Sequence, residues 1–184
     1  MRCTFVLSAA VAVLAIGAPE LTHGVSTPHQ IAQRATMQMP QSIQTEHEAI
    51  HSALIEATKA PGRVGAAAKE LATVLGPHFK REEEIALPPL GLLAPLAAGE
   101  NPVGMEAVLS MTDALRKELP RMLEEHKQIR DATERLRVAA REAKASVHEQ
   151  FAEDLALHAR TEEQVLYPAA ILVGDIVRAR MAQK

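Results

Sequence analysis

Residues 155–168 read LALHARTEEQVLYP, and this stretch decides how the rest of the chain is interpreted. Folded as a helix, it presents one face whose members recur at steps of three and four residues: Leu155, His158, Glu162 and Val165. A histidine and a carboxylate one turn apart, beside leucine and valine, are costly to bury without partners. A metal ion is the simplest partner that suits both side chains.

The same pattern occurs a second time, in LGPHFKREEEIALP, where His78 and Glu82 take the corresponding places. The preceding segments match as well, because EHEAI contains His47 and EHKQI contains His126. His47 lies 31 residues before His78, and His126 lies 32 residues before His158. Two helical hairpins of one design predict an all-α, up-down four-helix bundle with a pseudo-twofold axis.

Composition agrees with this fold class and narrows the chemistry. The chain of 184 residues is long enough for one domain with a core, and its 47% hydrophobic residues include no Trp, one Tyr and three Phe. A net charge of −3 with dispersed basic residues argues against a nucleic-acid partner. Cys3 is the only cysteine, which excludes an intrachain disulfide and leaves histidines and carboxylates as metal ligands. These ligands suit iron, manganese or zinc.

The first 24 residues resemble a secretory signal peptide. Arg2 supplies a positive charge, and residues 4–18, TFVLSAAVAVLAIGA, form an apolar run that is short for a membrane span. Cleavage near Gly17 or after Gly24 would give an exported protein, periplasmic or secreted, with no stable membrane span. The alternative is a start at a later methionine, which would leave the protein in the cytoplasm.

That later start is Met37 or Met39, within a polar linker that we expect over residues 25–43. The helical domain is expected over residues 44–182, with a capping box at Thr45 opening its first helix. The helices are predicted at about residues 45–60, 63–86, 104–143, 146–166 and 169–182.

Prolines mark the expected irregularities. Pro77 should kink the second helix, Pro120 should bend or break the third, and Pro168 should separate the fourth from a terminal amphipathic helix. This last helix is expected to cap the bundle or to pair with another subunit. The apolar connection at residues 90–102 should pack over one end of the bundle.

In such a bundle the repeated histidines and glutamates converge inside. A carboxylate binds one metal through each oxygen, so Glu82 and Glu162, on opposite hairpins, can bridge a pair of metals. Imidazole and carboxylate ligands with room for a small molecule favour iron. A helical bundle without any metal is the plain alternative.

The ordered pattern H…HxxxE…H…HxxxE, over about residues 42–170, resembles the hemerythrin-like, or HHE cation-binding, domain. The resemblance implies a four-helix bundle with a non-haem di-iron centre, that is, two iron ions. Carried over by position, it implies that His47 and His78 bind one iron and that His126 and His158 bind the other. Glu82 and Glu162 would bridge the two irons.

Two departures from the oxygen-carrying hemerythrins concern the ligand set. Their second carboxylate lies five residues after the last histidine, where this chain has Glu163, but the internal repeat favours Glu162. Their fifth histidine lies where this chain has Arg130, whose pseudo-twofold equivalent is His51. His51 is therefore interpreted either as an added iron ligand, or as a residue that sits half-exposed or supports a ligand from behind.

The pattern says less about the side chains next to the expected ligands. The glutamates that flank them are expected to be solvated, with one able to accept a hydrogen bond from a ligand: Glu46, Glu83, Glu125 and Glu163. Tyr167, whose counterpart in the first half is Leu87, is expected to pack, with contact to the metal pocket as the weaker option.

A competing interpretation starts from His47-Glu48-Ala49-Ile50-His51, which matches the HExxH motif of zinc hydrolases. Glu48 would be the general base, and the two histidines would hold zinc. This interpretation explains five residues and leaves the second half of the repeat without a role.

The expected function is a non-haem di-iron protein that binds or senses oxygen or a related small molecule. A di-iron oxidoreductase acting on peroxide or nitric oxide, and a protein for iron storage or sensing, use the same ligand motif. The expected partner is accordingly a small diatomic ligand or peroxide, and the terminal helix offers a surface for oligomer formation.

Overall fold

The computed structural model describes residues 38–183, which contain helices and no strand. The expected signal peptide and most of the expected linker lie outside the described residues. Four long helices account for most of the fold: α2 (Gln41–Lys59), α3 (Gly62–Ile85), α5 (Val108–Glu142) and α6 (Ser146–Thr161). The predicted all-α, hemerythrin-like four-helix bundle is confirmed.

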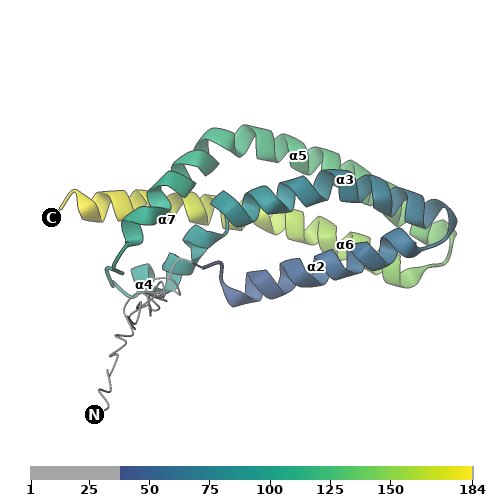
Figure 1. Cartoon of the computed structure of the whole chain (residues 1–184), viewed down its shortest axis with the longest axis horizontal. Coiled ribbons are helices and arrows are strands. Elements are labelled where there is room, and N and C mark those ends of the chain that lie inside the picture. Colours follow the sequence, from purple (N-terminus) through teal and green to yellow (C-terminus); the bar gives the residue numbers. More distant parts are fainter. Residues whose placement is uncertain (1–37, 184) are drawn as a thin grey trace, which may run out of the picture.

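The long helices form two antiparallel hairpins that lie side by side (Figure 1). Short turns join α2 to α3 and α5 to α6 at the same end of the molecule. Around the bundle, α2 packs on α3, α3 on α5, and α5 on α6, while α2 makes a thinner contact with α6. The space between α2 and α6 is therefore the most open side of the bundle.

The start of α2 differs from the expected one. The helix begins at Gln41, inside the expected linker, and Pro40 takes the N-cap position. The carbonyl of Pro40 accepts hydrogen bonds from the backbone N–H groups of Ile43 and Gln44, both at 3.0 Å. Thr45 lies within the helix, so the prediction of a capping box there was wrong.

Pro77 and Pro120 lie inside α3 and α5 without ending them. Figure 1 shows that α5 bends in its first half and remains one helix, so the third helical region is bent and not broken. A proline inside a helix removes one backbone hydrogen bond and crowds the preceding turn, which accounts for a bend.

Both repeats widen at the glutamate of their HxxxE segment. The backbone N–H of Leu87 bonds to the carbonyl of Glu82 at 3.0 Å, and that of Tyr167 bonds to the carbonyl of Glu162, each spanning five residues. In each case the next residue is a proline, which has no backbone N–H to continue the regular helical hydrogen bonds. In the second repeat this turn is the π-helical segment η3 (Glu162–Leu166), which leads directly into α7 (Tyr167–Met181).

The wide turn changes which side chains face inward. Val165, which a regular helix would place on the inner face, is 55% exposed, whereas Tyr167 is fully buried. The expected separation at Pro168 is therefore a local widening, after which the chain continues as a helix.

The connection after α3 and the helix α7 close one end of the bundle. Three short elements lie in this connection: η1 (Pro88–Leu92), α4 (Leu93–Ala97) and η2 (Met105–Ala107). Together with α5 and α7 they enclose an apolar cluster: Leu92, Leu96, Met105, Val108, Val173 and Val177. The prediction that the apolar connection packs over one end is confirmed, and α7 caps this end by packing on α5 and η1.

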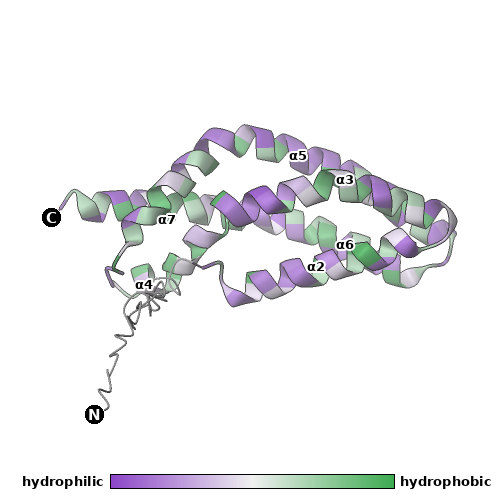
Figure 2. Cartoon of the chain, in the orientation of Figure 1, coloured by the Kyte–Doolittle hydropathy of each residue, from purple (hydrophilic) through white to green (hydrophobic). Residues whose placement is uncertain are grey.

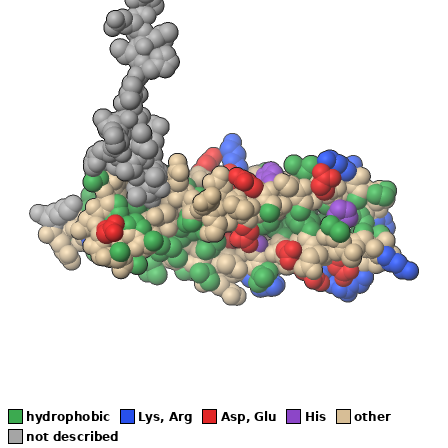
Figure 3. Space-filling view, turned by 90° about the horizontal axis from the view of Figure 1, so that it is seen from below, with side chains coloured by type: hydrophobic (Ala, Val, Ile, Leu, Met, Phe, Trp, Pro, Cys, Tyr) green, Lys and Arg blue, Asp and Glu red, His purple; other side chains and the backbone are tan. Residues whose placement is uncertain are grey.

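The main core lies between the four long helices and is rich in leucine and alanine, including Leu54, Leu71 and Leu136. Hydrophobic and hydrophilic residues alternate around each helix (Figure 2), as expected for amphipathic helices. On the face seen in Figure 3, acidic and basic side chains are interspersed. None of the helices that the structure describes is both long and apolar enough to cross a membrane.

Candidate metal centre

Six histidine and glutamate side chains are buried in the middle of the bundle, each at most 2% exposed: His47, His78, Glu82, His126, His158 and Glu162. They come from α2, α3, α5, α6 and η3, and they are the repeated histidines and glutamates of the sequence. The hairpin repeat thus brings all six together, as the pattern predicted. Burial of so many polar groups is costly unless each finds a partner.

The six residues form two groups with ligand atoms close enough for one metal each. The His78/His126 group also contains Glu82 and Glu162, and the His47/His158 group also contains Glu162. Within each group the candidate ligand atoms lie within 4.8 Å of one another. Glu162 belongs to both groups.

The grouping of the histidines corrects an expectation. The resemblance paired His47 with His78 and His126 with His158, that is, within each hairpin. The structure pairs them across hairpins, because α3 packs against α5 and α2 faces α6. The ring centroids of His78 and His126 are 4.6 Å apart, and those of His47 and His158 are 5.0 Å apart.

Glu162 directs its two oxygens to different groups. Its Oε1 lies 2.9 Å from Nε2 of His158 and 3.5 Å from Nε2 of His47, whereas its Oε2 lies 3.5 Å from Nε2 of His126. Glu82 approaches the His78/His126 group, with its Oε1 3.2 Å from Nε2 of His78. A carboxylate in the position of Glu162 can hold one cation through each oxygen.

Several of these buried atoms have no neighbour with hydrogen-bond geometry among the described residues: both ring nitrogens of His47 and His158, Oε2 of Glu82 and Oε1 of Glu162. Buried polar atoms in native proteins are nearly always satisfied, and an unpartnered one costs about 1–3 kcal/mol. All these atoms are metal-ligand types. The residues present therefore fit a cation on each side of Glu162.

Each histidine of the His78/His126 group is supported from outside by a glutamate. Nδ1 of His78 lies 2.9 Å from Glu125 and Nδ1 of His126 lies 3.0 Å from Glu163, both with hydrogen-bond geometry. An ionised carboxylate only accepts, so Nδ1 carries the proton and Nε2 turns to the cluster.

The His47/His158 group has the pseudo-twofold counterparts of these contacts, at longer range. Nδ1 of His158 lies 3.1 Å from Glu46, and Nδ1 of His47 lies 3.5 Å from Glu83, neither with hydrogen-bond geometry. Sequence reasoning expected one supporting glutamate and missed that all four flanking glutamates face an Nδ1 atom. Their spacing carried the signal, since each directly precedes or follows a repeated residue.

Charge coupling sets the protonation of the metal-free cluster. Burial lowers the pKa of His126, but the neighbouring carboxylates of Glu162 and Glu82 outweigh it and raise the pKa to about 10. For His158, burial is likewise outweighed by Glu162, and the pKa rises to about 9. Burial raises the pKa of Glu162, but its histidine partners hold that pKa well below the ordinary value. The extra protons are those that a metal must displace.

His51 is not brought into the cluster. Its side chain is exposed, its ring lies 6.1 Å from that of Phe79, and it lines a small surface cavity with His47 and Glu83. No ligand-type group among residues 38–183 contains His51. The expectation that it completes an iron site is not supported by this position, and the HExxH motif does not assemble a zinc site because only His47 points inward.

Tyr167 enters the His78/His126 group. Its hydroxyl donates a short hydrogen bond to Oε1 of Glu82 and lies 3.1 Å from Nε2 of His126 and 3.3 Å from Nε2 of His78. Packing was the preferred expectation, and contact with the metal pocket, the weaker option, is what the structure shows. Its counterpart Leu87 is also buried but brings no polar atom.

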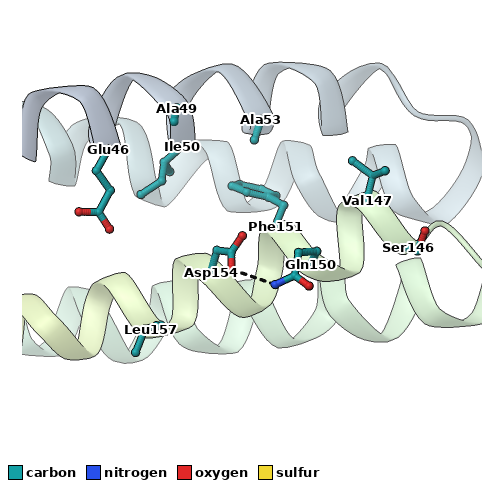
Figure 4. A pocket seen from close by; sticks show the side chains of 10 residues that line it. All are labelled: Glu46, Ala49, Ile50, Ala53, Ser146, Val147, Gln150, Phe151, Asp154 and Leu157. Carbon is teal, nitrogen blue, oxygen red and sulfur yellow. Dashed lines mark hydrogen bonds between the residues drawn. The ribbon is translucent and has the colours of Figure 1, made fainter. Parts of the chain in front are cut away.

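A groove of about 820 Å³ runs along the open side between α2 and α6 (Figure 4). It is lined by ten residues, among them Ala49, Ile50 and Phe151. At one end Glu46 points into the space between the helices, and its carboxylate contacts His158. The groove therefore ends at a glutamate that contacts the His47/His158 group.

Comparison with known proteins gives one family. The family model described as hemerythrin HHE cation binding domain matches residues 39–170. Searches of curated proteins and of solved structures gave no match. The matched segment covers most of the chain and contains all six buried ligand-type residues. The chain therefore belongs to the hemerythrin family of HHE cation-binding domains.

Proposed function

We propose that the chain holds two iron ions, one in each group, and uses them to bind or sense oxygen or a related small molecule. The observation that carries the proposal is the position of Glu162, whose Oε2 faces His126 and whose Oε1 faces His47 and His158. A carboxylate that divides its oxygens between two histidine pairs supports a bridged pair of metals.

The chemistry of the donor set supports iron. Four imidazoles and two carboxylates are the candidate ligands, and the chain's single cysteine is far from them in sequence. Imidazole with carboxylate suits redox-active iron, while structural zinc sites favour thiolates. An iron pair would supply electrons to a small molecule bound at an open coordination position.

The groove between α2 and α6 supports a role with a small ligand. Of the sides of the bundle, this one has the thinnest helix contact, and it reaches the His47/His158 group through Glu46. On the opposite side, α3 and α5 make the most extensive helix contact of the bundle. We infer that a diatomic molecule or peroxide enters from this groove, past Glu46.

Metal analysis and oxygen exposure of one purified sample test the proposal. We expect about two irons per chain, and a visible charge-transfer band that forms when oxygen meets the reduced protein and reverses under vacuum. Zinc alone, or no metal, would overturn the di-iron centre. Steady consumption of peroxide or nitric oxide would instead favour the oxidoreductase alternative.

Export is a separate proposal, supported by the composition of residues 1–24 alone. Sequencing the N-terminus of the native protein tests it. A mature end between Ala18 and Val25 supports export, and an end at Met1, Met37 or Met39 overturns it.

A further inference from the structure

Tyr167 stands out because the proposed function does not use it. It is the only tyrosine of the chain, its side chain is 0% exposed, and its hydroxyl lies among three candidate ligand atoms. These are Nε2 of His78, Nε2 of His126 and Oε1 of Glu82.

The distances around this hydroxyl are those between ligands of one metal. Two ligands bound at right angles, each about 2.1 Å from a metal, lie about 3 Å apart. The Tyr167 oxygen lies 3.1 Å from Nε2 of His126 and 3.3 Å from Nε2 of His78. The spacing between Nε2 of His78 and Oε1 of Glu82, two candidate ligands, is 3.2 Å. The phenol oxygen thus has the spacing of a further ligand.

The glutamates that face the histidine Nδ1 atoms are also held differently in the two groups. On the Tyr167 side, Arg130 pairs with Glu163, and Arg121 pairs with Glu125 at 3.0 Å. On the other side, Glu46 and Glu83 are 54% and 46% exposed. Neither of these two has an Arg or Lys within ion-pair distance in the part of the chain that the structure describes.

We propose that Tyr167 binds the metal of the His78/His126 group as a phenolate, leaving the exchangeable position on the metal of the His47/His158 group. This rests on the proposed di-iron function and adds to it a division of roles between the two metals. On ligation of iron(III), the O–H bond breaks, a metal–oxygen bond forms and the proton leaves to solvent, with no change of oxidation state. Tyrosine is an established iron ligand elsewhere, in haem proteins.

The position of the groove agrees with this division. It is lined by Glu46, which contacts His158, and the repeat counterpart of Tyr167 is Leu87, which brings no phenol oxygen to the His47/His158 group. A small molecule that arrives through the groove meets the less saturated metal first. The His78/His126 group, which contains Tyr167, lies farther from the groove.

Resonance Raman spectroscopy of the iron(III)-loaded protein tests the ligand. We expect a visible phenolate-to-iron(III) charge-transfer band and tyrosine ring modes enhanced within it. Because Tyr167 is the only tyrosine, growth on ring-deuterated tyrosine should shift these modes without any mutation. Tyr167→Phe should abolish the charge-transfer band and the tyrosine modes while two irons per chain remain. Phe79→Leu changes a side chain that stacks on His47, in the other group, and should keep the band and the modes.

The outcomes separate the two proposals. Two irons per chain without enhanced tyrosine modes would overturn the ligand and leave the di-iron centre standing. Absence of iron would overturn the proposed function itself. Azide added to the iron(III) protein should bind once per chain and leave the tyrosine modes in place. Loss of those modes on azide binding would place the exchangeable position on the tyrosine's metal and contradict the division.

Discussion

Glu163 accepts a hydrogen bond from Nδ1 of His126 at 3.0 Å, so it holds the outer side of the ring whose Nε2 faces Glu162. The two neighbouring glutamates thus contact the same imidazole from opposite sides. Glu162 is 1% exposed and belongs to both ligand groups, whereas the Glu163 side chain is 23% exposed and pairs with Arg130.

This arrangement predicts unequal effects of two matched substitutions. Glu162→Gln replaces a bridging carboxylate and should lower iron content from about two to one or fewer per chain. Glu163→Gln keeps an acceptor for Nδ1 and should retain both irons, with affinity weakened about 10- to 100-fold. Iron per chain after dialysis against a chelator series measures both. Equal losses in the two variants would contradict the assignment of the bridge to Glu162.

The metal-free protein should lose stability as the pH rises. The pKa values of His126 and His158, about 10 and 9, lie above the ordinary 6.5, so their protons stabilise the fold fully below pH 6.5 and progressively less up to pH 10. The lowered pKa of Glu162 acts in the other direction, with its contribution lost as the pH falls below about 4.5. Urea midpoints of the metal-free protein should therefore decline from pH 6.5 to 10.

Bound metal should stabilise the protein more strongly as the pH rises over the same range. A metal takes the place of the Nε2 protons, so metal affinity should rise with pH from 6.5 upward. Urea midpoints measured with and without iron should diverge as the pH increases. Parallel curves would mean that the metal does not compete with protons on these histidines.

The six buried ligand-type residues could be predicted from the sequence because helix periodicity places residues of an HxxxE segment on one face. The pairing of the histidines could not, because periodicity does not determine which helix neighbours that face. His126 faces His78 only because α5 packs on α3.

Tyr167 was harder still to predict. In a regular helix a residue five positions after Glu162 is rotated by about 140° from it. The hydrogen bond from the Tyr167 N–H to the Glu162 carbonyl widens this turn and brings the tyrosine back to the inner face. From the sequence alone Pro168 predicts a bend, whereas the structure has a widened helical turn just before it.

Access through the α2–α6 groove predicts a change in ligand-binding rate. Ala49 is exposed, lines the groove and lies one turn after Glu46. Ala49→Phe should narrow the entrance and slow azide binding to the iron(III) protein, by about tenfold or more, with iron content unchanged. Ala66→Phe is the matched control, an exposed alanine in the separate groove between α3 and α5. Equal rates in both variants, measured by stopped flow, would place the entrance elsewhere.

The crossing of α7 over α5 depends on a glycine. A Cβ added at Gly174 would lie 2.2 Å from Oγ1, 2.7 Å from Cβ and 3.1 Å from Cγ2 of Thr112. Thr112 is 2% exposed, so its side chain has little room to move, and forced overpacking of this kind costs about 1–3 kcal/mol. Gly174→Ala should lower the free energy of unfolding by that amount in urea titrations.

Thr112→Ala removes Oγ1 and Cγ2, so the double variant should lose less stability than the sum of the single changes. Additive losses would show that α7 shifts as a whole to admit the methyl group, and that the contact between Gly174 and Thr112 does not fix its position.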